Sequence, residues 1–117
     1  MITLEEAVKI AKEYLEREGL FVRNTCNDLG DSWIFGYGRK ESPQEVSTDG
    51  ALVKVDKEIG HVAWTYLGVP GEENFDKIMK APKIDISEYL SKEDVALCKV
   101  PLQITFPEDI TVIESGR

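Results

Sequence analysis

The side chains of this chain that could take part in catalysis are one histidine, two cysteines and many carboxylates. His61 has no second histidine with which to form a metal-binding pair, and it follows Gly60 at the predicted start of a strand. A thiol nucleophile would require Cys26 or Cys98 to meet His61 in space, and nothing in the local sequence favours that. We therefore interpret His61 as a surface residue and keep a small hydrolase only as an alternative.

The carboxylates and glycines also lack the spacing of a recognisable site. Neighbouring acids such as Glu72 and Glu73 do not face each other on a helix, and charged runs are usually solvated. Residues 28–31 lack the alternating oxygen ligands of a calcium loop, and residues 36–38 lack the third glycine of a dinucleotide-binding loop. The sequence therefore predicts no catalytic, metal-binding or cofactor-binding residues.

Length and charge limit the classes of function that remain. The 117 residues predict one domain, and a hydrophobic content of 42% is enough for a core. The 22 acidic and 14 basic residues give a net charge of −8, which disfavours nucleic acid and anionic membrane surfaces as partners. The same charge suits a basic protein partner, or simply keeps the chain in solution.

The start of the chain and its cysteines predict a cytoplasmic protein. No basic and apolar leader follows Met1, and no apolar run approaches the roughly 20 residues of a membrane span. Two cysteines without a secretory signal indicate free thiols, although a disulfide between Cys26 and Cys98 stays open at this point.

One helix and several strands must position these side chains. Thr3 and Glu6 have the spacing of a capping box, and apolar residues recur with helical period up to a stop at Gly19. Strands are predicted over residues 20–23, 33–37, 51–56 and 61–66, separated by a turn at 27–31, a loop at 39–50 and a tight hairpin at 56–60. Gly36 and Gly38 indicate a bulge or a close approach of two backbones.

The last third of the chain predicts further, shorter elements. Asn74 is expected to cap a short helix that ends before Pro82, and a second helix is expected over residues 87–99, with Ser91 and Asp94 in capping-box spacing. Strands are expected at 102–106 and 111–113. Whether residues 82–117 complete the sheet or form an arm stays open.

Together these elements predict an α+β fold, in which an amino-terminal helix packs on an antiparallel β-meander, with a helical and strand extension at the carboxyl end. Residues 1–117 form a single domain, with 1–70 as its core and 71–117 as the extension. Aromatic side chains share one face on each of two strands. Trp33, Phe35 and Tyr37 lie on one face of the strand at 33–37, and Trp64 and Tyr66 lie with Val62 on one face of the later strand. One helix cannot cover both faces of a sheet, so either the extension or a partner must cover the second.

Several motifs in residues 1–70 resemble one known family. They are a capped helix with Glu6-Ala7 and Tyr14-Leu15, a Trp33-x-Phe35 strand, the hairpin Val55-Asp56-Lys57-Glu58-x-Gly60, and Leu67-Gly68 after the next apolar strand. This pattern resembles the YrhB-like family, also called the immunity protein 35 family. The resemblance implies a small cytoplasmic α+β protein that neutralises a cognate toxin, and one member of the family has been described as chaperone-like.

The resemblance and the charge lead to a functional hypothesis. The chain is expected to be a non-enzymatic immunity protein that blocks a basic toxin domain by stoichiometric occlusion, without a cofactor. The expected contacts are the loop at residues 39–50, exposed acids and one aromatic side chain: Glu41, Glu45, Asp49, Glu72, Glu73 and Trp64. The alternatives are a chaperone-like or housekeeping protein that binds apolar segments, and the small hydrolase. The oligomeric state is not predicted.

Overall fold

A computed structural model describes residues 1–45 and 50–102 of the chain, and it has the predicted α+β architecture. Five strands form one antiparallel sheet in the order β4-β3-β2-β1-β5. Strands β1 to β4 form the predicted meander, and β5 returns to pair with β1. The elements in chain order are α1 (Leu4–Glu16), β1 (Leu20–Asp28), β2 (Ser32–Arg39), β3 (Ala51–Asp56), β4 (Val62–Tyr66), α2 (Glu73–Lys80), β5 (Lys83–Asp85), a 3-10 turn η1 (Ser87–Tyr89) and α3 (Lys92–Cys98).

Helix α1 begins at the predicted capping box. The Glu6 amide donates to Thr3 Oγ1 at 3.1 Å, and the Thr3 amide donates to Glu6 Oε1 at 2.8 Å. After Glu16 the chain turns through Gly19, whose φ of +74° is readily adopted only by glycine, and enters β1. The helix buries the apolar stripe Ala7, Val8, Ala11 and Leu15 against the sheet.

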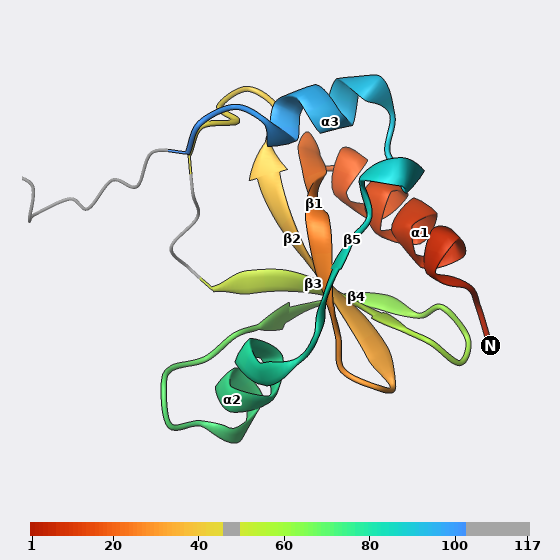
Figure 1. Ribbon diagram of the computed structural model, residues 1–117, viewed down its shortest axis with the longest axis vertical. Helices are drawn as coiled ribbons and strands as arrows, with labels where there is room; N and C mark the ends of the chain where they lie inside the picture. Colours follow the sequence, from red (N-terminus) through yellow and green to blue (C-terminus); the bar gives the residue numbers. More distant parts are fainter. Residues whose placement is uncertain (46–49, 103–117) are drawn as a thin grey trace, which may run out of the picture.

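Helix α1 covers one face of the sheet, as predicted from its single apolar stripe. Trp33 and Phe35 on β2 and Val53 and Val55 on β3 are buried beneath it, and Tyr37 packs at the border of the same cluster. Helix α2 lies on the opposite side of the sheet, and α3 lies across one end (Figure 1). The apolar core is therefore mainly the layer between α1 and the sheet.

The opposite face explains the two glycines of β2. Beyond Val22 and Tyr37 the register of β1 on β2 shifts, so that residues 23–25 of β1 lie opposite Gly36 alone. A Cβ on Gly38 would come within 2.5 Å of the Phe21 ring, which is buried against the backbone there. The predicted bulge is confirmed, and at Gly38 it is the Phe21 side chain, not a second backbone, that approaches closely.

Helix α3 is anchored to both α1 and β1. Ser91 caps it by accepting from the Asp94 amide at 3.1 Å, which confirms the predicted spacing. Asp94 is buried, and its Oδ2 lies 3.3 Å from Lys12 Nζ on α1. The first turn of α3 thus faces α1 through this ion pair, and its last residue, Cys98, donates to the Val22 carbonyl of β1.

Three predictions from the sequence were wrong in detail, two of them in the carboxyl-terminal third. Asn74 does not cap α2, because the N-cap is Glu72 and the Asn74 Nδ2 donates instead to the Tyr66 carbonyl at 2.6 Å. The helix expected over 87–99 is split, since Leu90 has extended backbone angles between η1 and α3. The predicted turn at 27–31 begins later, because β1 continues to Asp28 while paired with β2 and β5.

Strand β5 shows that the chain after residue 82 returns to the sheet. It pairs with β1 through Thr25, Cys26 and Asn27, and Ile86 immediately after it is fully buried in the cluster beneath α1. This stretch therefore completes the sheet at the β1 edge. The strands expected at 102–106 and 111–113 lie outside the described residues, apart from Leu102.

Candidate functional site

A trough lies on the α1 face of the sheet, beyond the end of the helix. Because α1 ends at Glu16, this part of the face has no helix over it. The trough has a volume of about 330 Å³, and we call it the β4 trough. Four strands and the chain after α1 contribute to its walls: Glu18, Leu20, Tyr37, Arg39, Ala51, Trp64 and Tyr66.

Aromatic rings form one end of the β4 trough. The Trp64 ring contacts Tyr37 edge-on, with ring centroids 5.3 Å apart, and Tyr14 of α1 at 5.9 Å. Trp64 is nevertheless 36% exposed, and Tyr66 two residues further along β4 is 62% exposed. Ring packing on one side fixes Trp64 while its other side stays accessible, so this indole is already held in place for a contact.

Charged side chains form the other end of the trough. Glu18 and Arg39 line it, and neither forms an ion pair within residues 1–45 and 50–102. In contrast, Glu16 is engaged by Lys40 at 3.7 Å and by Lys12 at 4.0 Å. The last turn of α1 carries no basic residue, so its carbonyl end adds negative potential beside Glu18.

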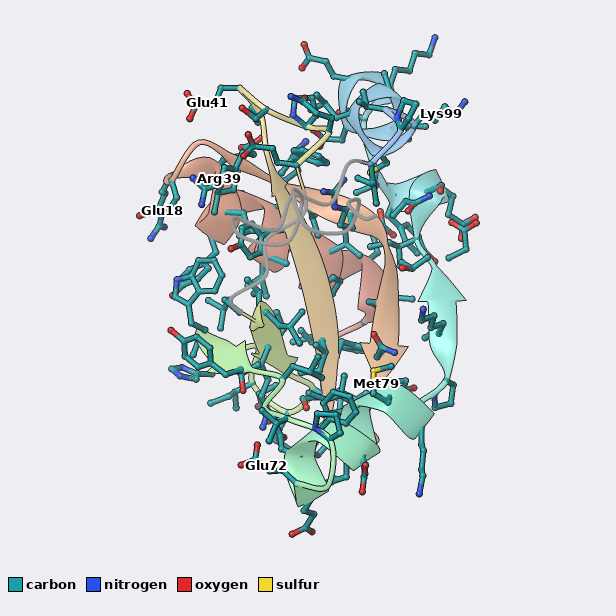
Figure 2. The ribbon with its side chains drawn as sticks, turned by 90° about the vertical axis from the view of Figure 1, so that its left-hand side faces the viewer. Glu18, Arg39, Glu41, Glu72, Met79 and Lys99 are labelled. Atoms are coloured by element: carbon teal, nitrogen blue, oxygen red, sulfur yellow. The ribbon has the colours of Figure 1, made fainter. Side chains whose placement is uncertain are left out.

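The β4 trough continues into a second hollow that reaches Glu41. This hollow, of about 300 Å³, shares Glu18, Leu20 and Arg39 with the trough and adds Lys40 and Glu41. Figure 2 shows Glu18, Arg39 and Glu41 near one another on the side of the sheet where β4 lies. One continuous surface therefore joins Trp64 to Glu41.

The six residues proposed from the sequence are divided between separate places. Trp64 lines the β4 trough, and Glu41 lies at its far end. Glu45 is exposed, and its carbonyl accepts from Arg23 Nη2 at 3.4 Å, whereas Asp49 lies outside the described residues. Two further acids, Glu72 and Glu73, start α2 at the opposite end of the molecule (Figure 2).

Glu72 has a local structural role. Its Oε1 accepts from the Val69 amide at 2.9 Å and so closes the turn that precedes α2. The trough includes Arg39, the first residue of the loop expected to make contacts, and also Glu18 and Tyr66, which the sequence did not single out as contacts. Tyr66 could have been found from its period-two spacing with Trp64, but Glu18 and Arg39 meet only because Leu20 pairs with Arg39.

Cys98 and His61 lie at different ends of the sheet. Cys98 donates to the Val22 carbonyl, with Sγ 3.6 Å from the oxygen, beside the β2 end that carries Tyr37. His61 is exposed and precedes Val62. Val62 pairs with Val55, and Val55 pairs with Trp33, so His61 lies at the end of the sheet where β2 starts. The Cys98–His61 pair of the hydrolase alternative is therefore not formed.

Both thiols are free and protonated at neutral pH. Burial, with a smaller contribution from Asp28, raises the pKa of Cys26 to about 11. Burial also raises the pKa of Cys98. A nucleophilic cysteine needs the opposite shift, so these side chains behave as small core residues. Among the described residues no group of three histidines, cysteines or acids is placed to hold a metal ion.

Comparison with models of protein families, with curated proteins and with solved structures finds no match to this chain. Within residues 1–45 and 50–102, no helix is both long and apolar enough to cross a membrane. The surface of the β4 trough is therefore the feature of the molecule that bears on function.

Proposed function

We propose that this chain is a non-enzymatic, immunity-type binding protein, which acts in the cytoplasm and neutralises a cognate toxin by stoichiometric occlusion. The observation that carries the proposal is the pair of exposed aromatic residues on β4, Trp64 and Tyr66, in one trough with Glu18, which has no ion-pair partner in the described part of the chain. Tryptophan and tyrosine dominate the energetics of protein interfaces because they bury a large area at a low cost in conformational entropy.

The charge of the chain supports a basic partner. At a net charge of −8 it attracts a positively charged surface over several ångströms, which speeds encounter. Glu18 and Glu41 border the same surface as Trp64, so the acids that steer a partner also lie next to the expected anchor. The resemblance of residues 1–70 to the YrhB-like family is the reason for proposing a toxin as that partner.

The chaperone-like alternative receives less support. A protein that binds apolar segments of many clients is expected to expose one broad apolar patch. Within the described residues, the exposed large apolar side chains are spread over separate elements: Met1, Ile59 in the β3–β4 hairpin, Trp64 and Tyr66 on β4, Val69 in the following loop, Met79 on α2 and Leu102.

Co-expression with the protein encoded by the adjacent reading frame tests the proposal. Cells that produce both proteins should survive where cells producing the neighbour alone die, and the two proteins should elute together at one-to-one stoichiometry. Survival without a complex would contradict occlusion. Absence of both protection and binding would contradict the immunity role.

A matched pair of variants tests whether the β4 trough is the surface involved. Trp64→Ala removes the exposed anchor and should weaken the complex by about 30-fold or more, which corresponds to about 2 kcal/mol. Met79→Ala removes a side chain that is 61% exposed on α2, away from the trough, and should leave the affinity unchanged. Equal affinities for the two variants would place the interface elsewhere.

A further inference from the structure

The backbone of β4 presents an open hydrogen-bonding edge beside the trough. The Asp56 amide donates to the His61 carbonyl at 2.9 Å, and the Leu67 amide donates to the Gly50 carbonyl at 2.8 Å. In an antiparallel ladder the bonded pairs alternate, so Ala63 and Thr65 bond to β3 in the same way. The amides and carbonyls of the alternate residues therefore point away from β3.

The residues whose backbone groups point away from β3 are Val62, Trp64 and Tyr66. The side chains of Trp64 and Tyr66 also line the trough. Within residues 1–45 and 50–102, β3 is the only strand that pairs with β4. The Tyr66 carbonyl is occupied by Asn74 Nδ2 at 2.6 Å, which closes the edge at that end. The Val62 and Trp64 peptide groups and the Tyr66 amide thus remain as an edge for about one short added strand.

The side-chain chemistry beside this edge specifies what the added strand carries. A residue placed directly opposite Trp64 has its side chain on the same face of the sheet, and that face holds the trough. There it enters the trough beside the rings of Trp64 and Tyr66. The same trough is lined by Glu18, which follows the carbonyl end of α1 and forms no ion pair within the described residues. Aromatic faces together with a carboxylate favour a cation.

We infer that β4 binds its partner by strand addition, with an extended segment of a basic protein paired to Val62 and Trp64 and a lysine or arginine side chain of that segment in the β4 trough. The inference rests on the proposed function and specifies how the partner is held. Arg39 lines the same charged end of the trough as Glu18, so it disfavours a second cation and suits an acidic or polar side chain elsewhere in the segment. A second copy of this chain is a poorer occupant, because two chains at −8 repel each other.

The probe is a synthetic peptide, acetyl-Thr-Val-Thr-Arg-Thr-Val-Thr-amide, and its matched control has glutamate in place of arginine. Titration into the isotope-labelled chain should shift the amide protons of Val62, Trp64 and Tyr66 downfield, because these gain hydrogen bonds. The amides of Ala63 and Thr65 already bond to β3 and should shift little. The glutamate peptide should bind at least about tenfold more weakly.

Variants of the chain separate backbone pairing from side-chain recognition. Val62→Pro removes one outward amide at the first position of an edge strand, where proline is tolerated, and should reduce peptide affinity at least about fivefold relative to Val62→Ala. Glu18→Gln should weaken the arginine peptide, whereas Arg39→Gln should leave its affinity equal or tighter. The alternating amide shifts of the unaltered chain provide a test even if Val62→Pro does not fold.

The outcomes separate this inference from the function on which it rests. Uniform shifts along β4, equal binding of the two peptides, or no shifts at several millimolar arginine peptide would overturn strand addition. A dimer of the chain that Val62→Pro dissociates would assign the edge to a second copy and also overturn it.

If the neighbouring toxin binds while the peptide fails, the immunity role stands and the mode of recognition is wrong. If the peptide binds as expected and no toxin does, strand addition stands and the immunity role is wrong.

Discussion

The two edges of the sheet differ in length, charge and exposure. Strand β4 has five residues, none of them charged, and exposes Trp64 and Tyr66. Strand β5 has three residues, of which Lys83 and Asp85 are charged and exposed. Backbone hydrogen bonds to β1 also hold β5 at both ends. The Asp28 amide donates to the Pro82 carbonyl, and the Ile86 amide donates to the Asn24 carbonyl.

This difference indicates which edge is available to a partner. Proteins usually protect the edges of their sheets with short strands, lysines and other charges, because an open edge invites pairing with another chain. Strand β5 has these features, and β4 has none of them. An unprotected edge with exposed aromatic side chains promotes aggregation unless a partner covers it. We therefore assign binding to β4.

The largest expected effect concerns the anchoring of β5. Ile86 is fully buried beneath α1, so Ile86→Ala should destabilise the fold by about 2–5 kcal/mol through lost burial and the cavity left behind. Urea denaturation measures this loss. Ile59→Ala is the matched control, because Ile59 is 77% exposed in the β3–β4 hairpin and its truncation should change stability by less than about 0.5 kcal/mol. Similar losses for both variants would mean that β5 is not anchored through Ile86.

A smaller effect is expected when a protective charge is placed on β4. Tyr66→Lys puts a cation at the mouth of the trough, where it repels a basic partner, and should weaken binding by about tenfold, or 1.4 kcal/mol. Stability should hardly change, because Tyr66 is mostly exposed. Calorimetric titration with the toxin measures the affinity, and Tyr66→Gln controls for loss of the ring. Equal affinity for the lysine and glutamine variants would contradict a basic partner.

An ion pair between the two halves of the sheet gives a pH-dependent prediction. Lys57 Nζ in the β3–β4 hairpin donates to Asp28 Oδ1 at 2.7 Å, and the Gly30 amide donates to the same oxygen at 2.8 Å. The hydrogen bond from Lys57, followed by that from Gly30, lowers the pKa of Asp28 below its ordinary value of 3.8. The pair therefore stabilises the fold above that value, and the contribution is lost as pH falls through the lowered pKa.

Asp28→Asn should accordingly cost about 1 kcal/mol at neutral pH, measured by urea denaturation. The difference between the variant and the unaltered chain should shrink as pH falls below 3.8. Glu58→Gln, an exposed neighbour in the same hairpin, is the control and should have no such dependence. A difference that stays constant with pH would mean that the charge of Asp28 does not contribute.

The smallest effect on stability, and a change in association, is expected when charge is removed from β5. Lys83→Val with Asp85→Val leaves the fold within about 0.5 kcal/mol, because both side chains are exposed. The uncharged strand should nevertheless promote self-association, which light scattering detects. A monomeric double variant would show that strand length alone protects this edge.

The sequence predicted the elements that depend on local chemistry. The capping box of α1, the aromatic face of β2 and the tight approach at Gly38 follow from residue types and spacing, and each is present. Strand β5 was missed because three residues with two charges carry no strand signal, and its formation depends on burial of Ile86 at long range. Of the residues that line the β4 trough, Trp64 and Arg39 were expected as contacts, whereas the hollow itself depends on the register of β1 on β2, which places Arg39 beside the chain after α1.

The most direct test of the account uses the two tryptophans of the chain. Trp33 is buried under α1 and Trp64 lies in the β4 trough, so 5-fluorotryptophan labelling gives one fluorine resonance for each, assigned with Trp33→Phe. Addition of the unlabelled toxin should shift the Trp64 resonance and leave that of Trp33 in place. A complex in which the Trp64 resonance does not move would contradict the assignment of binding to β4.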